Sequence, residues 1–360
     1  MFITFIIEKF KNKQITFSDL FENPQTIAEI TRNEKQITIE TKPPKNAPAI
    51  IEFYKQALLR LTITLPELME YTPETIKQSY TTYRIPKKSG GFRTINAPNE
   101  RLKMIQRHVL NTLQSFNTLM HNSAYAYIKG RSAYDAQIKH KNNNSNWFLH
   151  IDLKDFFGSC TQTFVYEQIS KVYPFYLLKL DENCDKIIKQ IVNIACLDGV
   201  LPQGNPLAPY FTNLLMVPFD YQLDKLTPVY TRYSDDMLFS ARTKLDVPKI
   251  LTCINEIFKD TPLKINPEKT RLGSKNGNNW NLGLMLNKEN NITVGHKAKR
   301  IYKTKIDQFL YDPESYSIAD IQKLAGITSY YKHIEPQYFS YIIDKYSEKH
   351  NKDLLALLKT

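Results

Sequence analysis

Apolar residues recur at near-helical spacing in several stretches of the chain, and each such stretch predicts an amphipathic helix. Residues 49–61 and 247–259 show this pattern, and residues 101–119 place Leu102, Ile105, His108, Val109, Leu113 and Phe116 along one side. A further helix is predicted to begin near Tyr210, and two more over Ile318–Tyr331 and Phe339–Tyr346. Residues 41–48 contain three prolines, which is typical of a linker.

Short β-prone runs alternate with these helices. Trp147–Ile151 predicts a strand that leads directly to Asp152. The runs on either side of Asp235 and Asp236 predict two short strands with the aspartates at the turn between them. Residues 83–98 contain Ser-Gly-Gly between two β-prone flanks, which predicts a second hairpin. The chain is therefore expected to mix helices with a sheet.

Composition supports a globular protein, with 42% hydrophobic and 23% charged residues among 360. No apolar run approaches the roughly 20 residues that a membrane span needs. The opening MFITFIIEKF is too short and too soon charged for a signal peptide, so we expect a cytoplasmic protein. The four cysteines form no CxxC pair, which favours reduced thiols over a zinc site or disulfides.

The net charge of +12 indicates a polyanionic partner. Between Arg84 and His140 there are ten Lys or Arg residues against two acidic ones, so most of the excess lies ahead of Asp152. A solvated basic face is the alternative interpretation.

The stretch Thr231–Phe239 reads TRYSDDMLF and carries the strongest chemical signal. Adjacent carboxylates such as Asp235 and Asp236 repel each other in half-buried surroundings unless they share a cation. Hard oxygen ligands suit Mg²⁺, which takes one or two carboxylates and leaves its other positions to water and phosphates. Taken alone, the pair favours a solvated turn over a metal site, because Asp is a preferred turn residue.

Two further stretches change that balance. Residues 148–157 read FLHIDLKDFF, and residues 201–209 read LPQGNPLAP. Together with YSDD, they resemble the palm motifs of reverse transcriptases in their order. The resemblance implies that Asp152, Asp235 and Asp236 are catalytic residues that bind two Mg²⁺ ions, for which Mn²⁺ could substitute. Asp236 is the weaker ligand in this interpretation.

The same resemblance, which covers about Tyr83 to Tyr346, implies a nucleotide site. The cationic hairpin looks like the fingers hairpin that binds the incoming triphosphate, with Arg93 as one cation and Lys87 or Lys88 as the other. Phe157 matches the aromatic steric gate that selects dNTPs over rNTPs. The Gln203 amide can bond the sugar or base, and Lys269 resembles the lysine near the leaving pyrophosphate. An exposed lysine without that role is an equal alternative for Lys269.

Other residues are expected to hold nucleic acid. The mixture of aromatic and basic residues in AYAYIKGRSAYDAQIKH, residues 124–140, suits stacking on unpaired bases while holding phosphates. Asn281–Leu284 resembles the primer-grip hairpin of the family. The predicted nucleic-acid contacts are Lys103, Arg107, Lys129, Arg131 and Gly283.

The fold implied is α+β, a right-hand polymerase with fingers, a ferredoxin-like palm and a short helical thumb. The predicted division is an N-terminal extension and start of fingers at 1–82, fingers at 83–146, palm at 147–290 and thumb at 291–360. A fingers-type insertion is expected around residues 160–200 of the palm.

The implied activity is RNA-directed DNA synthesis, with an RNA template, a DNA product and dNTPs, and with a partner protein or a second copy as further partners. Retron enzymes carry Asn-Ala-x-x-His and Val-Thr-Gly signatures, whereas this chain keeps only His140 of the first and has Asn-Leu-Gly at the second. We therefore expect a bacterial enzyme of the antiphage-defence group that copies a dedicated non-coding RNA. A retron enzyme, a template-independent or protein-primed DNA polymerase, and a catalytically silent RNA-binding protein remain as alternatives.

Overall fold

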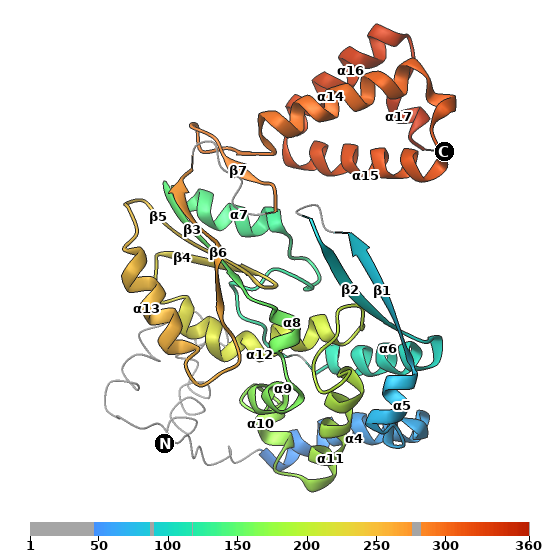
Figure 1. The fold of residues 1–360 in the computed structure, drawn as a ribbon, viewed down its shortest axis with the longest axis vertical. Helices are drawn as coiled ribbons and strands as arrows, with labels where there is room; N and C mark the ends of the chain where they lie inside the picture. The colour runs from blue at the N-terminus through green and yellow to red at the C-terminus, as the bar shows by residue number, and fades with distance from the viewer. Residues whose placement is uncertain (1–46, 87–89, 117, 276–281, 360) are drawn as a thin grey trace.

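A four-stranded antiparallel sheet stands at the centre of the chain (Figure 1). The computed structural model describes residues 47–86, 90–116, 118–275 and 282–359. The strands are β3 (Trp147–Leu153), β4 (Val229–Tyr233), β5 (Asp236–Ala241) and β6 (Ile265–Ser274). They lie in the order β4-β5-β3-β6, and every neighbouring pair is antiparallel.

Helices connect these strands in a βαββαβ sequence, which is the ferredoxin-like arrangement expected for a palm. Between β5 and β6 runs α13 (Val247–Ile257). The connection from β3 to β4 contains α8 (Phe156–Ser159), α9 (Gln162–Ile169), α10 (Phe175–Leu178), α11 (Glu182–Ala195) and α12 (Ala208–Leu223). The expectation of a mixed fold with a ferredoxin-like palm is confirmed.

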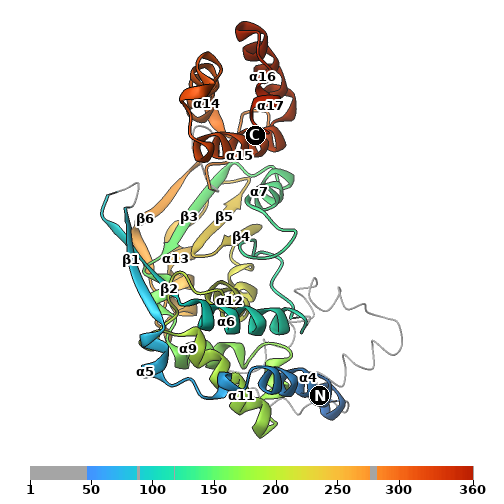
Figure 2. The same ribbon diagram turned by 90° about the vertical axis from the view of Figure 1, so that its right-hand side faces the viewer.

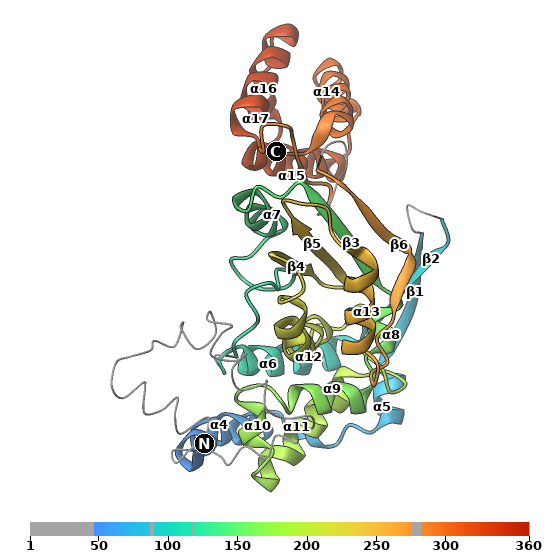
Figure 3. The same ribbon diagram turned by 90° about the vertical axis from the view of Figure 1, so that its left-hand side faces the viewer.

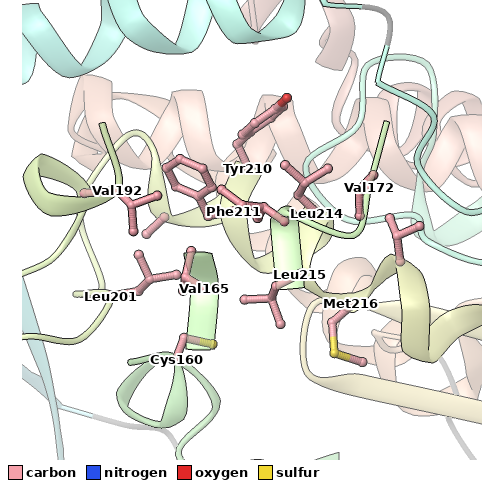
Figure 4. Packing of buried hydrophobic residues seen from close by; sticks show 14 of the residues in the cluster. Cys160, Val165, Val172, Val192, Leu201, Tyr210, Phe211, Leu214, Leu215 and Met216 are labelled. Carbon is pink, nitrogen blue, oxygen red and sulfur yellow. The ribbon is translucent and has the colours of Figure 1, made fainter. Parts of the chain in front are cut away.

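Helices α12 and α13 lie on one side of the sheet, and α9 packs against α12 (Figures 1 and 3). Leu149 and Ile151 of β3 point into this core with Met237 and Phe239 of β5, and all four are buried. Alternation along a strand sends every second side chain to the same face, which explains their spacing. Figure 4 shows the packing of residues of α9, α12 and the connecting loops in this core: Cys160, Val165, Leu201, Phe211, Leu214 and Leu215.

The other face of the sheet is divided into two halves. Phe148 and Leu238 lie on one half, in a second core that also contains residues of the C-terminal helices. The alternation then places His150, Asp152 and Asp236 on the other half of this same face. The polar half of this face carries the candidate chemistry, and its Asp152 and His150 are buried.

A β hairpin stands beside the sheet and points toward the C-terminal helices (Figures 1 and 2). It consists of β1 (Tyr80–Pro86) paired with β2 (Phe92–Pro98), as the sequence predicted. Gly90 and Gly91 both have positive φ, a conformation that glycine adopts without steric cost. Its base is carried by α4 (Ala47–Thr64), a 3₁₀ helix at Pro66–Met69, α5 (Pro73–Gln78) and α6 (Glu100–Gln114).

The C-terminal helices form a small bundle at one end of the sheet (Figure 2). The bundle contains α14 (Gly295–Tyr311), a 3₁₀ helix at Pro313–Ser315, α15 (Ile318–Ile334), α16 (Pro336–His350) and α17 (Leu354–Leu357). A short ladder of β7 (Met285–Leu286) and β8 (Ile292–Thr293) leads into it. Glu335 fixes the junction, because its carboxylate accepts hydrogen bonds from Thr293 Oγ1 at 2.8 Å and Lys299 Nζ at 2.5 Å.

The structure differs from the sequence predictions in three places. Pro48 lies inside α4, so the part of the predicted linker that is described is helical, and the rest lies outside the described residues. Helix α6 ends at Gln114, before the predicted end at residue 119. It exposes His108, which was expected on its apolar side, and buries Gln106. The reason is that Gln106 finds polar partners inside, Ile194 O at 2.8 Å and Tyr80 Oη at 3.1 Å.

Helix α7 (Ala133–Asn142) bears on the predicted division into four parts. It lies in the segment predicted as fingers, yet it packs against β4 and β8. The sheet region therefore uses residues ahead of Trp147, and the boundaries of the division stay predictions.

Candidate active site at the β4–β5 hairpin

The turn between β4 and β5 consists of Ser234 and Asp235, with Tyr233 and Asp236 paired at its base. Ser234 has φ +61°, in the left-handed region that non-glycine residues seldom adopt. The predicted hairpin with its aspartates at the turn is confirmed. A left-handed residue directly before Asp235 fixes the direction in which the chain carries that carboxylate.

The register of three strands brings the carboxylates together. Asp152 of β3 lies opposite Asp236 of β5 on one side and opposite Asn266 of β6 on the other. Directly opposed residues in an antiparallel pair point to the same face with their Cβ atoms about 4.5–5.5 Å apart. Two carboxylates therefore face each other across adjacent strands, and Asp235 stands at the end of the row.

Each of the two opposed aspartates has a cationic or polar partner. Lys269 Nζ lies 2.9 Å from Asp152 Oδ1, and Asn266 Nδ2 donates to Asp152 Oδ2 at 3.1 Å. His150 Nε2 lies 2.9 Å from Asp236 Oδ1. The pKa of Lys269 is raised, chiefly by its hydrogen bond to Asp152, so the ammonium form is favoured.

Among the residues that the structure describes, none gives Asp235 a comparable cationic partner, and the pKa of its carboxyl shows the consequence. Burial raises the pKa of its carboxyl above the ordinary value of 3.8, and the charges of Asp236 and Asp152 raise it further. Lys269 opposes the shift without cancelling it. The site therefore concentrates negative charge that a cation would relieve.

The oxygen donors of this row fit a hard divalent cation by chemical type. Within the described part of the chain, however, no three Asp, Glu, His or Cys side chains already converge as a set of metal ligands. Asp152 and Asp236 are instead turned to Lys269 and His150. Metal binding would require the carboxylates to exchange these partners.

The residues predicted to bind nucleotide surround this row in part. Arg93 lies exposed on β2 opposite Ile85, while Lys87 and Lys88 lie outside the described residues. Phe157 is half-buried and packs against the main core. It lies on the short helix α8 and not on a strand, because Asp155 turns left-handed with φ +44° and ends the extended run.

Gln203 lies in a turn that is fastened to the β1–β2 hairpin. Its carbonyl accepts a hydrogen bond from Asn96 N at 2.8 Å. The next residue, Gly204, has φ +116°, and a Cβ there would stand 2.5 Å from Asn96 O. Only glycine fits such a close approach of two backbones, so the Pro-Gln-Gly turn and the hairpin hold a fixed relation.

The residues predicted to hold nucleic acid differ in their exposure and in the partners of their side chains. Arg107, Lys129 and Gly283 are exposed, and Lys103 forms a surface ion pair with Glu100 at 3.0 Å. Arg131 donates from Nη1 to the carbonyls of His121 at 2.7 Å and Ala124 at 2.8 Å. Part of the Arg131 guanidinium is therefore engaged in fastening its own loop.

Sequence reasoning missed three residues of the site: His150, Asn266 and Arg232. His150 could have been found from period-two alternation along β3, since it falls on the strand face that carries Asp152, whereas Asn266 reaches Asp152 only through the pairing of β3 with β6. Arg232 is buried beneath the turn, and no sequence spacing points to its partner Asp220.

A ferredoxin-like sheet that carries three aspartates on one strand and one hairpin, flanked by a β hairpin and a helical bundle, defines a nucleic-acid polymerase of the right-hand class. The chain belongs to the reverse transcriptase family: residues 85–294 match the family described as "Reverse transcriptase (RNA-dependent DNA polymerase)". It is accordingly an RNA-directed DNA polymerase, which confirms the predicted activity.

Its relatives include retron reverse transcriptases. The chain is 31% identical over 283 residues to the retron Ec73 reverse transcriptase of Escherichia coli, covering 74% of this chain and 86% of that protein. It is 26% identical over 312 residues to the retron Ec86 reverse transcriptase of the same organism, covering 84% and 91%. The enzyme is thus a retron-like bacterial reverse transcriptase.

Solved structures with a similar fold include telomerases. The apo telomerase of Candida tropicalis has a TM-score of 0.45 and 16% identity, over 78% of this chain and 61% of that one. The telomerase of Candida albicans, in complex with a fragment of telomeric RNA, has a TM-score of 0.43 and 12% identity, over 80% and 64%. This chain spans less than two thirds of either telomerase chain.

Two coarser expectations follow from the family. Reverse transcriptases act on an RNA template and use divalent metal ions.

Among the described residues, no helix has both the length and the apolar character needed to cross a membrane.

Proposed function

We propose that this enzyme copies a dedicated non-coding RNA into DNA in antiphage defence, with Asp152, Asp235 and Asp236 as its catalytic carboxylates. The observation that carries the proposal is the row formed by Asp152 and Asp236 in register, with Asp235 at its end. Burial and mutual repulsion raise the pKa of Asp235, which marks the row as a place that favours a bound cation.

Two Mg²⁺ ions held by these carboxylates would activate the primer 3′-hydroxyl and stabilise the triphosphate and the leaving pyrophosphate. The chain itself contributes position and charge. Lys269 is 61% exposed at its side chain, so its ammonium is free to leave Asp152 and turn toward the pyrophosphate oxygens. His150 holds Asp236 from the side, which leaves Asp152 and Asp235 as the stronger ligands.

The nucleotide would lie between the palm and the β1–β2 hairpin. Arg93 offers a planar fork to the triphosphate, and either Lys87 or Lys88 supplies the second cation. The Gln203 amide would contact the sugar or base, because its turn is fastened to β2 at Asn96. Phe157 would lie under the sugar and exclude a 2′-hydroxyl.

The template and product would follow the basic surface around the sheet. The contacts proposed are Lys103, Arg107, Lys129, Arg131 and Gly283. The partners would be a non-coding RNA, the DNA product and dNTPs, with a partner protein or a second copy as a further component. The proposed location is the bacterial cytoplasm.

A retron role is the second candidate, and the 31% identity to the retron Ec73 enzyme favours it. Against it stand the two signature departures, at residues 136–140 and 281–283. Sequencing the RNA that copurifies with the enzyme, together with its DNA product, distinguishes the two roles.

The test is nucleotide incorporation by the purified chain with Mg²⁺, using dNTPs or rNTPs in separate reactions, before and after RNase treatment of copurified RNA. We expect dNTP incorporation that RNase abolishes and that D235N lacks. Synthesis that persists after RNase would contradict RNA templating and favour template-independent or protein-primed polymerisation. Incorporation retained by D235N would overturn the site assignment.

A further inference from the structure

The turn that carries Asp235 is supported from beneath by a buried ion pair. Arg232 of β4 and Asp220 of α12 both have fully buried side chains. Arg232 donates from Nε to Asp220 Oδ1 at 2.9 Å and from Nη2 to Asp220 Oδ2 at 2.7 Å, in bidentate geometry. Tyr230 Oη also donates to Asp220, at 2.9 Å. Desolvating two charges is costly, so a pair this complete needs a reason beyond stability.

The remaining guanidinium nitrogen points at the catalytic turn. Arg232 Nη1 donates to the carbonyl of Ser234 at 3.1 Å and to Asn213 Oδ1 at 3.1 Å. Ser234 is the left-handed residue, with φ +61°. A serine there is strained, and such strain persists only where its surroundings enforce it. The hydrogen bond from Arg232 Nη1 to the Ser234 carbonyl stabilises this left-handed conformation.

The same cluster reaches the neighbouring loop. Asn213 Nδ2 donates to Ala126 O at 2.6 Å, and the backbone of Arg232 exchanges hydrogen bonds with Ser123 O at 2.6 Å and Tyr125 N at 2.9 Å. The side chain of Arg232 therefore joins the palm helix to the catalytic turn, while its backbone and Asn213 connect both to loop 123–127.

We propose that Arg232 is a positioning residue: it sets the left-handed conformation of Ser234 and thereby aims the Asp235 carboxylate at the metal position. Asp220 orients the guanidinium through Nε and Nη2, and Asn213 accepts a hydrogen bond from Nη1. The inference rests on the proposed role of Asp235. A lysine would keep the charge but cannot bond Asp220 in bidentate fashion and Ser234 O together, because it lacks the planar fork.

The experiment compares R232K, S234G and the double variant with wild type. Glycine adopts positive φ without strain, so S234G removes the need for enforcement. We expect R232K to lower the rate of dNTP incorporation at saturating primer–template by about 100-fold, since small misplacements of catalytic groups have effects of that size. We expect its Mn²⁺ affinity to fall about tenfold, as for other residues that orient metal ligands. S234G should restore at least part of both losses.

Three controls separate positioning from folding. S234A removes the hydroxyl but keeps the strain, so it should not rescue R232K. D181N breaks the Lys55–Asp181 ion pair, 2.7 Å, far from the hairpin, and should leave incorporation rate and Mn²⁺ affinity unchanged. Binding of primer–template by R232K should match wild type. If R232K does not fold, N213A, which keeps the Arg232–Asp220 pair, takes its place with the same rescue.

Two results would overturn the inference while leaving the site assignment intact. One is an R232K enzyme with wild-type rate and Mn²⁺ affinity. The other is a loss that S234G does not relieve at all, since the role would then be general support of the fold. D235N tests the proposed function separately, because the catalytic assignment of Asp235 predicts loss of incorporation in this variant independently of the role of Arg232.

Discussion

Two histidines on the same face of the sheet illustrate the difference between its two halves. His140 of α7 is fully buried, with Nδ1 2.6 Å from Ser240 Oγ and Nε2 2.8 Å from Thr231 Oγ1. His150 of β3 instead lies beside the carboxylate of Asp236. The first is satisfied by neutral hydroxyls, and the second is part of a row of charges.

The pKa values express the same contrast. Burial, with the nearby charge of Lys139, lowers the pKa of His140 to about 3, so this ring stays neutral in the folded protein. In the carboxylate half, burial and like charges raise the pKa of Asp235. One half of the face is arranged for stability, and the other keeps an uncompensated charge that only a ligand relieves. Substitutions in the two halves should therefore affect different properties.

The largest effect is expected from D152N. It removes the carboxylate that lies opposite Asp236 while keeping shape and the hydrogen-bonding neighbours Asn266 and Lys269. We expect primer extension to fall by about a thousandfold, in the range found for losing one preorganised electrostatic contact. Thermal unfolding and RNA binding should match wild type. A D152N enzyme that unfolds earlier and extends primers normally would reverse the contrast between the halves.

H140A should show the opposite pattern. It removes a buried ring and leaves the hydroxyls of Ser240 and Thr231 without their shared partner. We expect a loss of about 2–4 kcal/mol in the free energy of unfolding, from the cavity and the unpaired polar groups together. Denaturant titration measures the loss, and incorporation per folded molecule should stay near wild type. A large fall in rate without a fall in stability would place His140 in the catalytic half.

Acid should destabilise the protein through His140. Its folded pKa of about 3 lies below the ordinary value of 6.5, so the unfolded chain binds the proton first. Stability from this group is complete above pH 6.5 and is lost as the pH falls, by about 1.4 kcal/mol for each unit between these two values. Unfolding free energies of wild type and H140Q at pH 7 and pH 5 test this. Equal pH dependence in both would contradict it.

The smallest expected effect is the change in stability caused by Asp235, and its pH dependence has the opposite sign to that of His140. Because the folded pKa of this carboxyl is raised above 3.8, its ionisation opposes folding as the pH rises through that range. Without divalent cations at pH 7, D235N should therefore unfold at a higher temperature than wild type. The difference should shrink when Mg²⁺ is added and vanish below pH 3.8. A D235N protein that is less stable at pH 7 would show that the charge is already compensated.

Much of this arrangement could be predicted from the sequence. The three aspartates, the strand before Asp152 and the hairpin around Asp235 follow from local patterns, because each motif lies within a single element or turn. The hairpin at residues 80–98 follows from Gly90 and Gly91 in the same way.

What could not be predicted depends on partners that folding brings together. Arg232 and Asp220 stand 12 residues apart on different elements, and nothing local pairs them. The sequence motif places Lys269 near the leaving pyrophosphate, and only the pairing of β3 with β6 puts it on Asp152. The sequence shows His140 as the one retained residue of a family signature, but its partners come from β4 and β5.

The most direct measurement of the central claim is Mn²⁺ binding, followed by electron paramagnetic resonance, to wild type, D152N and H140Q with primer–template and dNTP present. The account predicts tight binding by wild type and H140Q and a strong loss in D152N, because D152N removes one carboxylate of the row that would hold the metal, whereas H140Q leaves the row intact. Equal binding by all three proteins would contradict it.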